Sequence, residues 1–284
     1  MRGWRGYASR QVVGMSASVR LPAVAGRFYP DNPDQLRREL LQYTQAAGEQ
    51  LAAIGCIVPH AGYMYSGHVA GAVFARLKLP HRYIMLCPNH TGMGQPLAIM
   101  SRGLWETPLG HVRIDEELAS GLAASFPLLR EDPEAHLEEH ALEVQLPFLQ
   151  ILVPAFSFVP IAVGTSRYDV LEQLGDAIGR ALEQEPEPVL VVASSDMNHY
   201  EPDEVTRIKD RRALDRILEL DSQGLYDIVT RQQVSMCGFG PAIAMITAAK
   251  RRGATRAGLI KYATSGDVSG ERGLVVGYAG VAVM

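Results

Sequence analysis

Three histidines of this chain follow apolar runs that are typical of buried strands. His60 follows such a run and one proline, His90 follows another run, a proline and Asn89, and His199 comes shortly after a third run, residues 189–193. The carboxyl ends of parallel strands lie at one edge of a sheet, and α/β proteins bind their ligands there. Imidazoles gathered at such an edge bind transition metals or act as general bases. The spacing therefore predicts a metal site or a nucleophile site at one edge of a sheet.

A lone cysteine adds a second kind of ligand. Cys237 lies between Met236 and Gly238, ahead of a helical segment in which Pro241 can serve as the first residue. A helix N-terminus stabilises a thiolate, so Cys237 is expected to be a metal ligand or a nucleophile rather than an inert buried thiol. Cys56 and Cys87 lie inside apolar runs and are expected to be buried. Three scattered cysteines make no disulfide framework, which favours a reducing, cytoplasmic setting.

Carboxylates accompany these histidines. Asp196 and His199 follow the same strand, where they could bind a metal, transfer protons or orient the ligands, and Asp196 could also cap the next segment. His140 and Glu143 are three residues apart and would share a face of a helix expected over residues 138–152. His136 and His140 also fit the H-x-x-E-H pattern of inverted zinc peptidases, but five-residue matches arise by chance. We expect His140 to point into the shared pocket.

Two further residues are candidates for substrate binding. Tyr63 is expected to wall the pocket, and Asn89 lies in a small polar loop with Gly92 that suits an entering substrate. Asp267 lies in a polar loop after a strand, where it either reaches the same edge or belongs to a simple turn.

Strand-like and helix-like segments alternate along the chain. We expect helices near residues 32–45, 68–77, 116–125, 138–152, 168–184, 207–220, 223–230 and 241–252, and strands ending at 58, 87, 163 and 193 and spanning 259–264 and 274–283. This alternation predicts an α/β protein: a single three-layer α/β/α domain with a mostly parallel central sheet.

Composition excludes several classes of function. The 284 residues carry a formal net charge of −4, so nothing favours nucleic acid or an anionic membrane as a partner. Motifs for nucleotide phosphates, dinucleotides and serine hydrolases do not occur. Residues 1–20 contain four arginines and no acid, as a transit peptide would, but no amphipathic pattern accompanies them. We expect a flexible extension over residues 1–20 and a folded domain over 21–284.

Seven segments, in this order, resemble the Memo family (mediator of cell motility), whose bacterial and archaeal members are called AmmeMemoRadiSam system protein B. They are PAVAGRFY (22–29), VPHAGYMYSG (58–67), PNHTG (88–92), TPLG (107–110), EHALEVQLPF (139–148), SSDMNHY (194–200) and MCGFGP (236–241). The resemblance implies a fold like that of the class III extradiol (LigB-like) dioxygenases, which hold non-haem Fe(II) with two histidines and a carboxylate.

By this resemblance, His60, His90 and Cys237 would be the metal ligands, with Asp196 and His199 beside them. A cysteine replaces the carboxylate of the dioxygenases, and a thiolate favours Cu(I), zinc or iron. Three protein ligands leave an open position, as a catalytic site requires. The changed ligand argues against catechol ring cleavage. The family name also suggests a functional link to a radical-SAM protein.

Three functions remain open from the sequence. The first is an iron- or copper-dependent redox enzyme, with zinc as another metal candidate, that acts on a small-molecule or peptide substrate. The second is a metal-binding or protein-interaction module without turnover. The third is a metal-free cysteine hydrolase, in which Cys237 is the nucleophile, His199 the base and Asp196 the residue that orients the base.

Overall fold

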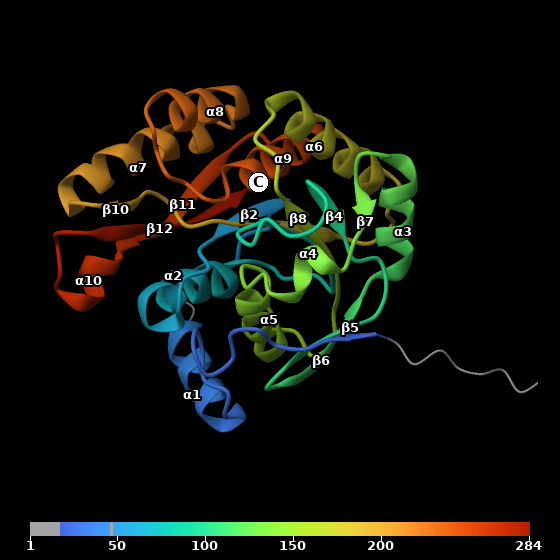
Figure 1. Cartoon of the computed structure of the whole chain (residues 1–284), viewed down its shortest axis with the longest axis horizontal. Helices are drawn as coiled ribbons and strands as arrows, with labels where there is room; N and C mark the ends of the chain where they lie inside the picture. Colours follow the sequence, from blue (N-terminus) through green and yellow to red (C-terminus); the bar gives the residue numbers. More distant parts are fainter. Residues whose placement is uncertain (1–17, 46–47) are drawn as a thin grey trace, which may run out of the picture.

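A central sheet runs through the molecule and separates two layers of helices (Figure 1). The computed structural model describes residues 18–45 and 48–284. Residues 1–17 of the expected extension lie outside the described residues, whereas Val19 and Arg20 form strand β1, which pairs with β5. The folded part therefore begins ahead of the predicted boundary at residue 21.

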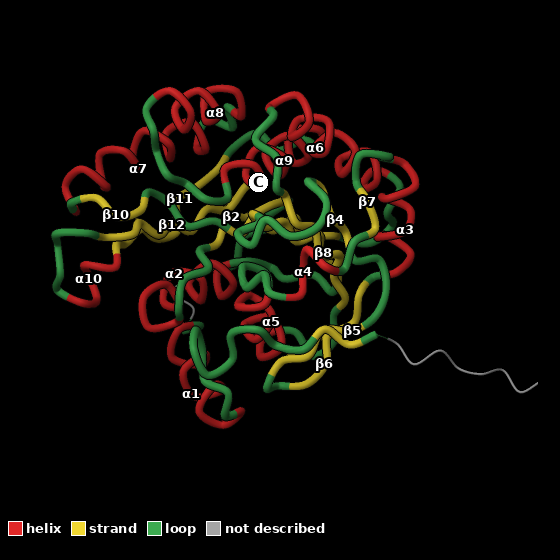
Figure 2. The backbone as a smooth tube through the Cα atoms, viewed as in Figure 1, coloured by secondary structure: helices red, strands yellow, loops and turns green. Residues whose placement is uncertain are grey.

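The strands are β1 (Val19–Arg20), β2 (Gly55–Val58), β3 (Arg82–Pro88), β4 (Leu97–Ile99), β5 (Leu104–Thr107), β6 (Gly110–Ile114), β7 (Arg130–Glu131), β8 (Ser157–Val163), β9 (Val189–Ser194), β10 (His199–Glu201), β11 (Ala257–Thr264) and β12 (Val275–Val283). Their order is β1-β5-β6-β8-β3-β9-β2-β12-β10, with β11 beside β12, β4 beside β8, and β7 beside β4. The central run β8-β3-β9-β2 is parallel throughout. Figure 2 shows strands of this sheet, among them β12, β2 and β8, across the middle of the molecule between the helices.

The helices are α1 (Pro33–Tyr43), α2 (Tyr63–Arg76), α3 (Glu116–Ser125), α4 (Glu134–Leu137), the 3₁₀ helix η1 (Glu143–Gln145), α5 (Leu146–Leu152), α6 (Tyr168–Glu183), α7 (Asp203–Leu218), α8 (Ser222–Arg231), α9 (Phe239–Arg251) and α10 (Ser265–Ser269). Helices α6, α7, α8 and α9 cover one face of the sheet, and α1, α2 and α5 cover the other (Figure 1). No helix within the described residues is long and apolar enough to cross a membrane.

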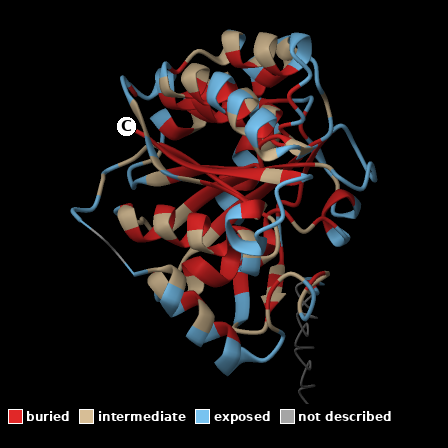
Figure 3. Ribbon diagram, turned by 90° about the vertical axis from the view of Figure 1, so that its left-hand side faces the viewer, coloured by how far each residue is buried: buried red, intermediate tan, exposed pale blue. Residues whose placement is uncertain are grey.

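The central strands are apolar on both sides because helices cover both faces. Ile57, Ile84, Met85, Val191 and Val192 are all fully buried. Successive residues of a strand point to opposite faces, so unbroken apolar runs are what this arrangement requires. Figure 3 shows the sheet as a buried layer between helices with exposed outer faces. The prediction of a single α/β domain with a mostly parallel sheet is confirmed.

The prediction of one long helix over residues 138–152 is wrong. The chain is helical in α4, leaves the helix, and returns through η1 to α5. Arg20 donates hydrogen bonds to the backbone carbonyls of His136 and Glu139, which a continuous helix would need for its own ladder. The Glu139 side chain also accepts from the N–H of Ala141, a local bond that competes with helix formation. The non-helical stretch carries His140 to the edge of the sheet.

Candidate metal centre

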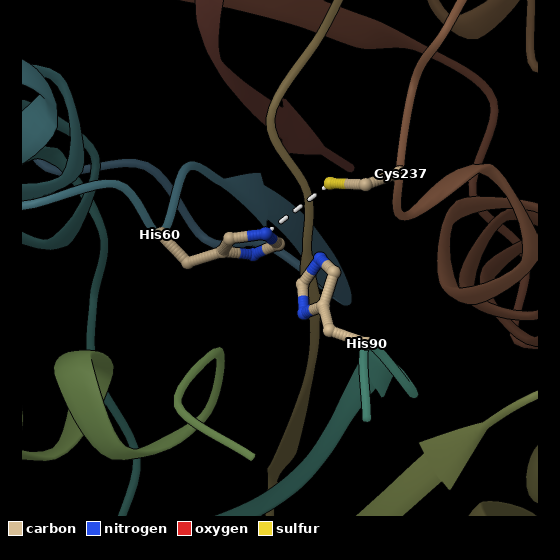
Figure 4. Close-up of side chains that lie close together, drawn as sticks. All are labelled: His60, His90 and Cys237. Atoms are coloured by element: carbon tan, nitrogen blue, oxygen red, sulfur yellow. Dashed lines mark hydrogen bonds between the residues drawn. The ribbon is translucent and has the colours of Figure 1, made fainter. Parts of the chain in front are cut away.

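Two parallel strands and one helix bring the predicted ligands together. His60 follows β2, His90 follows β3, and Cys237 lies just before α9, which packs on the same strands. One ligand atom from each of the three residues lies within 4.8 Å of the others. The Cys237 Sγ and His60 Nε2 atoms are 3.2 Å apart (Figure 4). The sequence motifs therefore meet at the carboxyl edge of the sheet, as predicted.

A hydrogen-bond chain fixes the tautomer of His60. The hydroxyl of Ser194 donates its single proton to the carbonyl of Ala141, at 2.7 Å. The same oxygen, which accepts from Gln145 Nε2, can then only accept from His60 Nδ1, at 2.9 Å. The proton of neutral His60 therefore lies on Nδ1, and the Nε2 lone pair faces Cys237. Burial, and then the neighbouring histidines, lower the pKa of His60 well below its usual range, which keeps this lone pair available.

A buried carboxylate orients His90. Glu139 is 1% exposed, and it accepts from the backbone N–H of His90 at 2.7 Å and contacts His90 Nδ1 at 3.0 Å. Burial lowers the pKa of His90, but the hydrogen bond and the charge of Glu139 outweigh this effect, and the net shift is upward. The proton on Nδ1 leaves Nε2 facing the other two ligands. Carboxylates commonly hold metal-binding histidines in this way.

Cys237 lies in a tightly enclosed turn. Its Sγ accepts from the N–H of Asp196 at 3.3 Å. The next residue, Gly238, has no room for a side chain, because a Cβ there would collide with the carbonyl oxygen of Ser194. Helix α9 begins at Phe239, so the expectation that Pro241 is its first residue is wrong. Burial, and then the charge of Asp196, raise the pKa of the Cys237 thiol, so a cation at the site would be needed to favour the thiolate.

Three more predicted residues line the same cavity. Asp196 Oδ1 accepts from the backbone N–H of His60, and burial raises the pKa of Asp196 to about 7. His199 Nδ1 donates to the carbonyl of Ser235 at 2.8 Å. The ring of His140 stacks on that of His90 with centroids 4.9 Å apart. Burial lowers the pKa of both His140 and His199, so both rings favour the neutral form.

Other predicted residues lie elsewhere. Glu143 is fully buried, where it pairs with Arg20 and accepts from the hydroxyl of Tyr29. Tyr63 does not line this cavity, because its hydroxyl donates to the carbonyl of Val144 at 2.7 Å.

The two remaining candidates hold their own loops in place. Asn89 donates to the carbonyl of Met93 and accepts from the N–H of Gly92, so its side chain closes the loop that carries His90. Asp267 accepts from the N–H of Thr264 in a capping box at the start of α10, and it pairs with Arg207. Cys56 and Cys87 are buried, as expected.

A cavity of about 750 Å³ opens in front of the three ligands. The residues that line it are Phe28, His60, Ala61, Gly62, Tyr65, His90, His140, Asp196, His199, Tyr200, Ser235, Cys237, Ser265, Ser269, Glu271, Leu274, Val276 and Tyr278. This volume is in the range of small-molecule sites. The ligands therefore face a space large enough for a substrate.

Sequence reasoning missed the residues that orient the ligands. Glu139, Ser194 and Gln145 hold the two histidines, and none of them touches the cavity. Glu139 directly precedes His140 in a motif that was recognised, so its position was a usable signal. Ser194 and Gln145 lie far from His60 in sequence, and only the fold brings them into contact with its surroundings.

The donor set fits a transition metal. Two imidazoles whose Nε2 atoms face the site and one thiol are borderline-to-soft ligands, suited to copper, zinc or iron and poorly suited to magnesium or calcium. A second cluster, His90, Glu139 and His140, also has its ligand atoms within 4.8 Å of one another. Both oxygens of Glu139 already accept hydrogen bonds from His90 and Ala141, so this carboxylate serves to orient His90.

Known proteins resemble this chain in sequence and in fold. Residues 20–282 match the Memo family, described as Memo-like protein. A MEMO1 family protein of Methanothermobacter thermautotrophicus is 40% identical over 92% of this chain and 99% of its own length. One of Methanosarcina barkeri is 42% identical over 93% and 100%. A crystal structure of an uncharacterized protein from Escherichia coli K12 shares the fold with a TM-score of 0.56 at 11% identity, covering 80% of this chain and 98% of that one.

Proposed function

The chain belongs to the Memo family, and we propose that it is a redox enzyme that depends on iron or copper. One metal ion would be held by His60, His90 and Cys237, with zinc as a competing occupant. The substrate would be a small molecule that enters the adjoining cavity. When bound, the metal would supply one-electron chemistry at a position that three protein ligands leave open.

The observation that carries this proposal is the orientation of the two histidines. Ser194 and Glu139 each hold an Nδ1 atom, so both Nε2 lone pairs point toward the sulfur of Cys237. A single hydrogen-bonded histidine is common in protein cores, but two fixed tautomers that converge on a thiol match the requirement for metal binding. The proposal rests on this convergence and needs no assumption about the substrate.

The other residues of the cavity would handle protons. Asp196 has a pKa of about 7, so it can hold or release a proton near neutral pH. His199 and His140 are neutral rings at the cavity wall, and His199 has Nδ1 committed to the carbonyl of Ser235. These groups would accept protons from a substrate or orient its polar atoms.

Metal-dependent oxygen uptake tests this function. Protein loaded anaerobically with iron or copper is mixed with ascorbate and air, and oxygen consumption is followed with an electrode. We expect uptake above that of the His60→Ala variant treated in the same way, and an unchanged rate in His111→Ala, which alters an exposed histidine of β6. Bound metal without any uptake would instead favour the non-catalytic metal-binding or protein-interaction module.

A second candidate function has its own observation. The 3.2 Å contact between Cys237 Sγ and His60 Nε2 also suits a cysteine nucleophile with a histidine base. In that case the base would be His60, held by Ser194, because His60 Nε2 contacts the sulfur, whereas His199 Nδ1 donates to Ser235 rather than to Asp196. The predicted pairing of His199 and Asp196 with the nucleophile is therefore replaced. Covalent trapping of Cys237 by a substrate-like electrophile in metal-free protein would favour this function.

A further inference from the structure

The cavity in front of the ligands has a buried floor and an open mouth. His60 and Tyr278 at its floor are each 2% exposed, whereas Tyr200 and Leu274 at its edge are 72% and 67% exposed. The mouth lies at β10, α10 and the start of β12. A substrate that reaches the ligands would therefore extend outward past this segment.

The walls between floor and mouth are aromatic and aliphatic. Phe28, Tyr65 and Tyr278 contribute rings, and Val276 and Leu274 contribute aliphatic side chains. Tyr65 and Val276 also pack against buried Tyr278, so this wall is backed by a small hydrophobic cluster that includes Val69 and Ala263. Such walls bind the flat or apolar body of a ligand through burial of apolar surface.

Apart from its histidines, the ionisable side chains with a charge at the cavity are acidic. Asp196 lies at the floor and Glu271 at the mouth, and no lysine or arginine is among the lining residues of the described chain. Arg272, which follows Glu271, pairs with Asp203 and Asp267, so it is engaged away from the cavity. Sites for phosphate or carboxylate groups usually supply arginine or lysine. This cavity supplies none from the lining residues that the structure describes.

We propose that the cavity selects a substrate with an aromatic or aliphatic body and no anionic substituent, and that it favours an ammonium group placed against Glu271. The proposal deepens the proposed function, because it assigns a substrate class to the same cavity. An anionic group would lose water beside Glu271, and no lysine or arginine among the described lining residues would pair with it. One oxygen of Glu271 accepts from the N–H of Gly273, which holds the carboxylate at the mouth.

A matched ligand series tests this selectivity. The probes are 2-phenylethylamine, 2-phenylethanol and 3-phenylpropionate, which share a phenyl body and differ in the terminal group. Their affinities are measured by NMR titration with Cu(I)-loaded and metal-free protein. Cu(I) is used because it has little affinity for carboxylate oxygen. We expect the amine to bind about two- to fivefold more tightly than the alcohol, as for a partly exposed ion pair, and the carboxylate to bind most weakly.

Two variants locate the effect. Glu271→Gln should bring the amine to the affinity of the alcohol, whereas Glu187→Gln, an exposed glutamate next to the opposite end of β9, should leave the ranking unchanged. Tyr65→Ala should weaken all three probes together. Tightest binding of the carboxylate, or an unchanged advantage of the amine in Glu271→Gln, would overturn the proposal.

The same samples separate this proposal from the proposed function. Metal content is measured alongside each titration. Charge selectivity in protein that retains no metal after loading would refute the metal enzyme and leave the cavity assignment intact. Full metal content without charge selectivity would refute the substrate class assigned to the cavity and leave the metal enzyme intact.

Discussion

The role of Glu139 can be tested by a single isosteric substitution. Glu139→Gln keeps the shape of the side chain but replaces one carboxylate oxygen with an NH₂ group. The carboxylate receives three hydrogen bonds, from the backbone N–H and Nδ1 of His90 and from the N–H of Ala141. In either amide orientation, the NH₂ group faces at least one N–H donor, so at least one of these bonds is lost. His90 therefore loses either the bond to its backbone N–H or the bond to its ring, and in both cases it loses the negative charge beside Nδ1.

The expected loss of metal affinity follows from what the hydrogen-bonded partners of metal-binding histidines contribute in other proteins. Loss of a hydrogen-bonded partner to a metal-binding histidine typically lowers metal affinity by about 10- to 100-fold, or roughly 1.4–2.7 kcal/mol. The upward shift in the pKa of His90 should also disappear, because it depends on the hydrogen bond and charge of Glu139. Metal-free Glu139→Gln should therefore have a lower His90 pKa than the parent.

Metal affinity is measured by competition with a chelator of known affinity, and the His90 pKa by NMR titration of the metal-free protein. The control is Glu138→Gln, which removes the same charge one residue away on an exposed side chain. Affinity for metal in Glu139→Gln within about twofold of the control would refute the reasoning that Glu139 orients a ligand.

Three further predictions concern stability and reactivity. Glu143→Ala should lower the free energy of unfolding in urea by about 3–5 kcal/mol, because Arg20 would be left buried without its charge partner; a loss below about 1 kcal/mol would contradict this role. Burial raises the pKa of Asp210 to about 7, so the folded state binds its proton more tightly than the unfolded state does. The stability from that proton is present below about pH 4 and is lost as the pH rises through 7, so the parent should lose about 2–3 kcal/mol relative to Asp210→Asn between pH 5 and 8; parallel curves would contradict it. Metal-free Cys237 should react with iodoacetamide more slowly than free cysteine at pH 7.5, and faster as the pH rises, because burial raises its pKa; fast alkylation at neutral pH would favour the nucleophile function.

The fold could be predicted because its signals are local. Apolar runs such as the one that ends at Cys87, and helical spacing such as that of Leu171 and Leu174, identify elements without knowledge of their neighbours. The meeting of His60 and His90 could also be predicted, since a parallel sheet gathers the residues that follow its strands. Cys237 precedes a helix, and the family resemblance placed it with them.

The errors came from contacts between distant parts of the chain. Arg20 interrupts the helix expected over residues 138–152 through bonds to carbonyls more than a hundred residues away. The same contacts bury Glu143, which the pattern had placed on the functional face of that helix. Arg20 itself belongs to residues 1–20, a stretch whose composition predicted a flexible extension. Hydrogen bonds of this kind leave no trace in local periodicity.

Metal content tests the central claim most directly. Parent protein, Cys237→Ser, His60→Ala and the control His111→Ala are purified anaerobically, incubated with iron or copper, desalted and measured by elemental analysis. The proposed centre predicts about one metal ion per chain in the parent and the control, and loss of that ion in both ligand variants. No metal in the parent, or equal metal in all four proteins, would contradict a site formed by His60, His90 and Cys237.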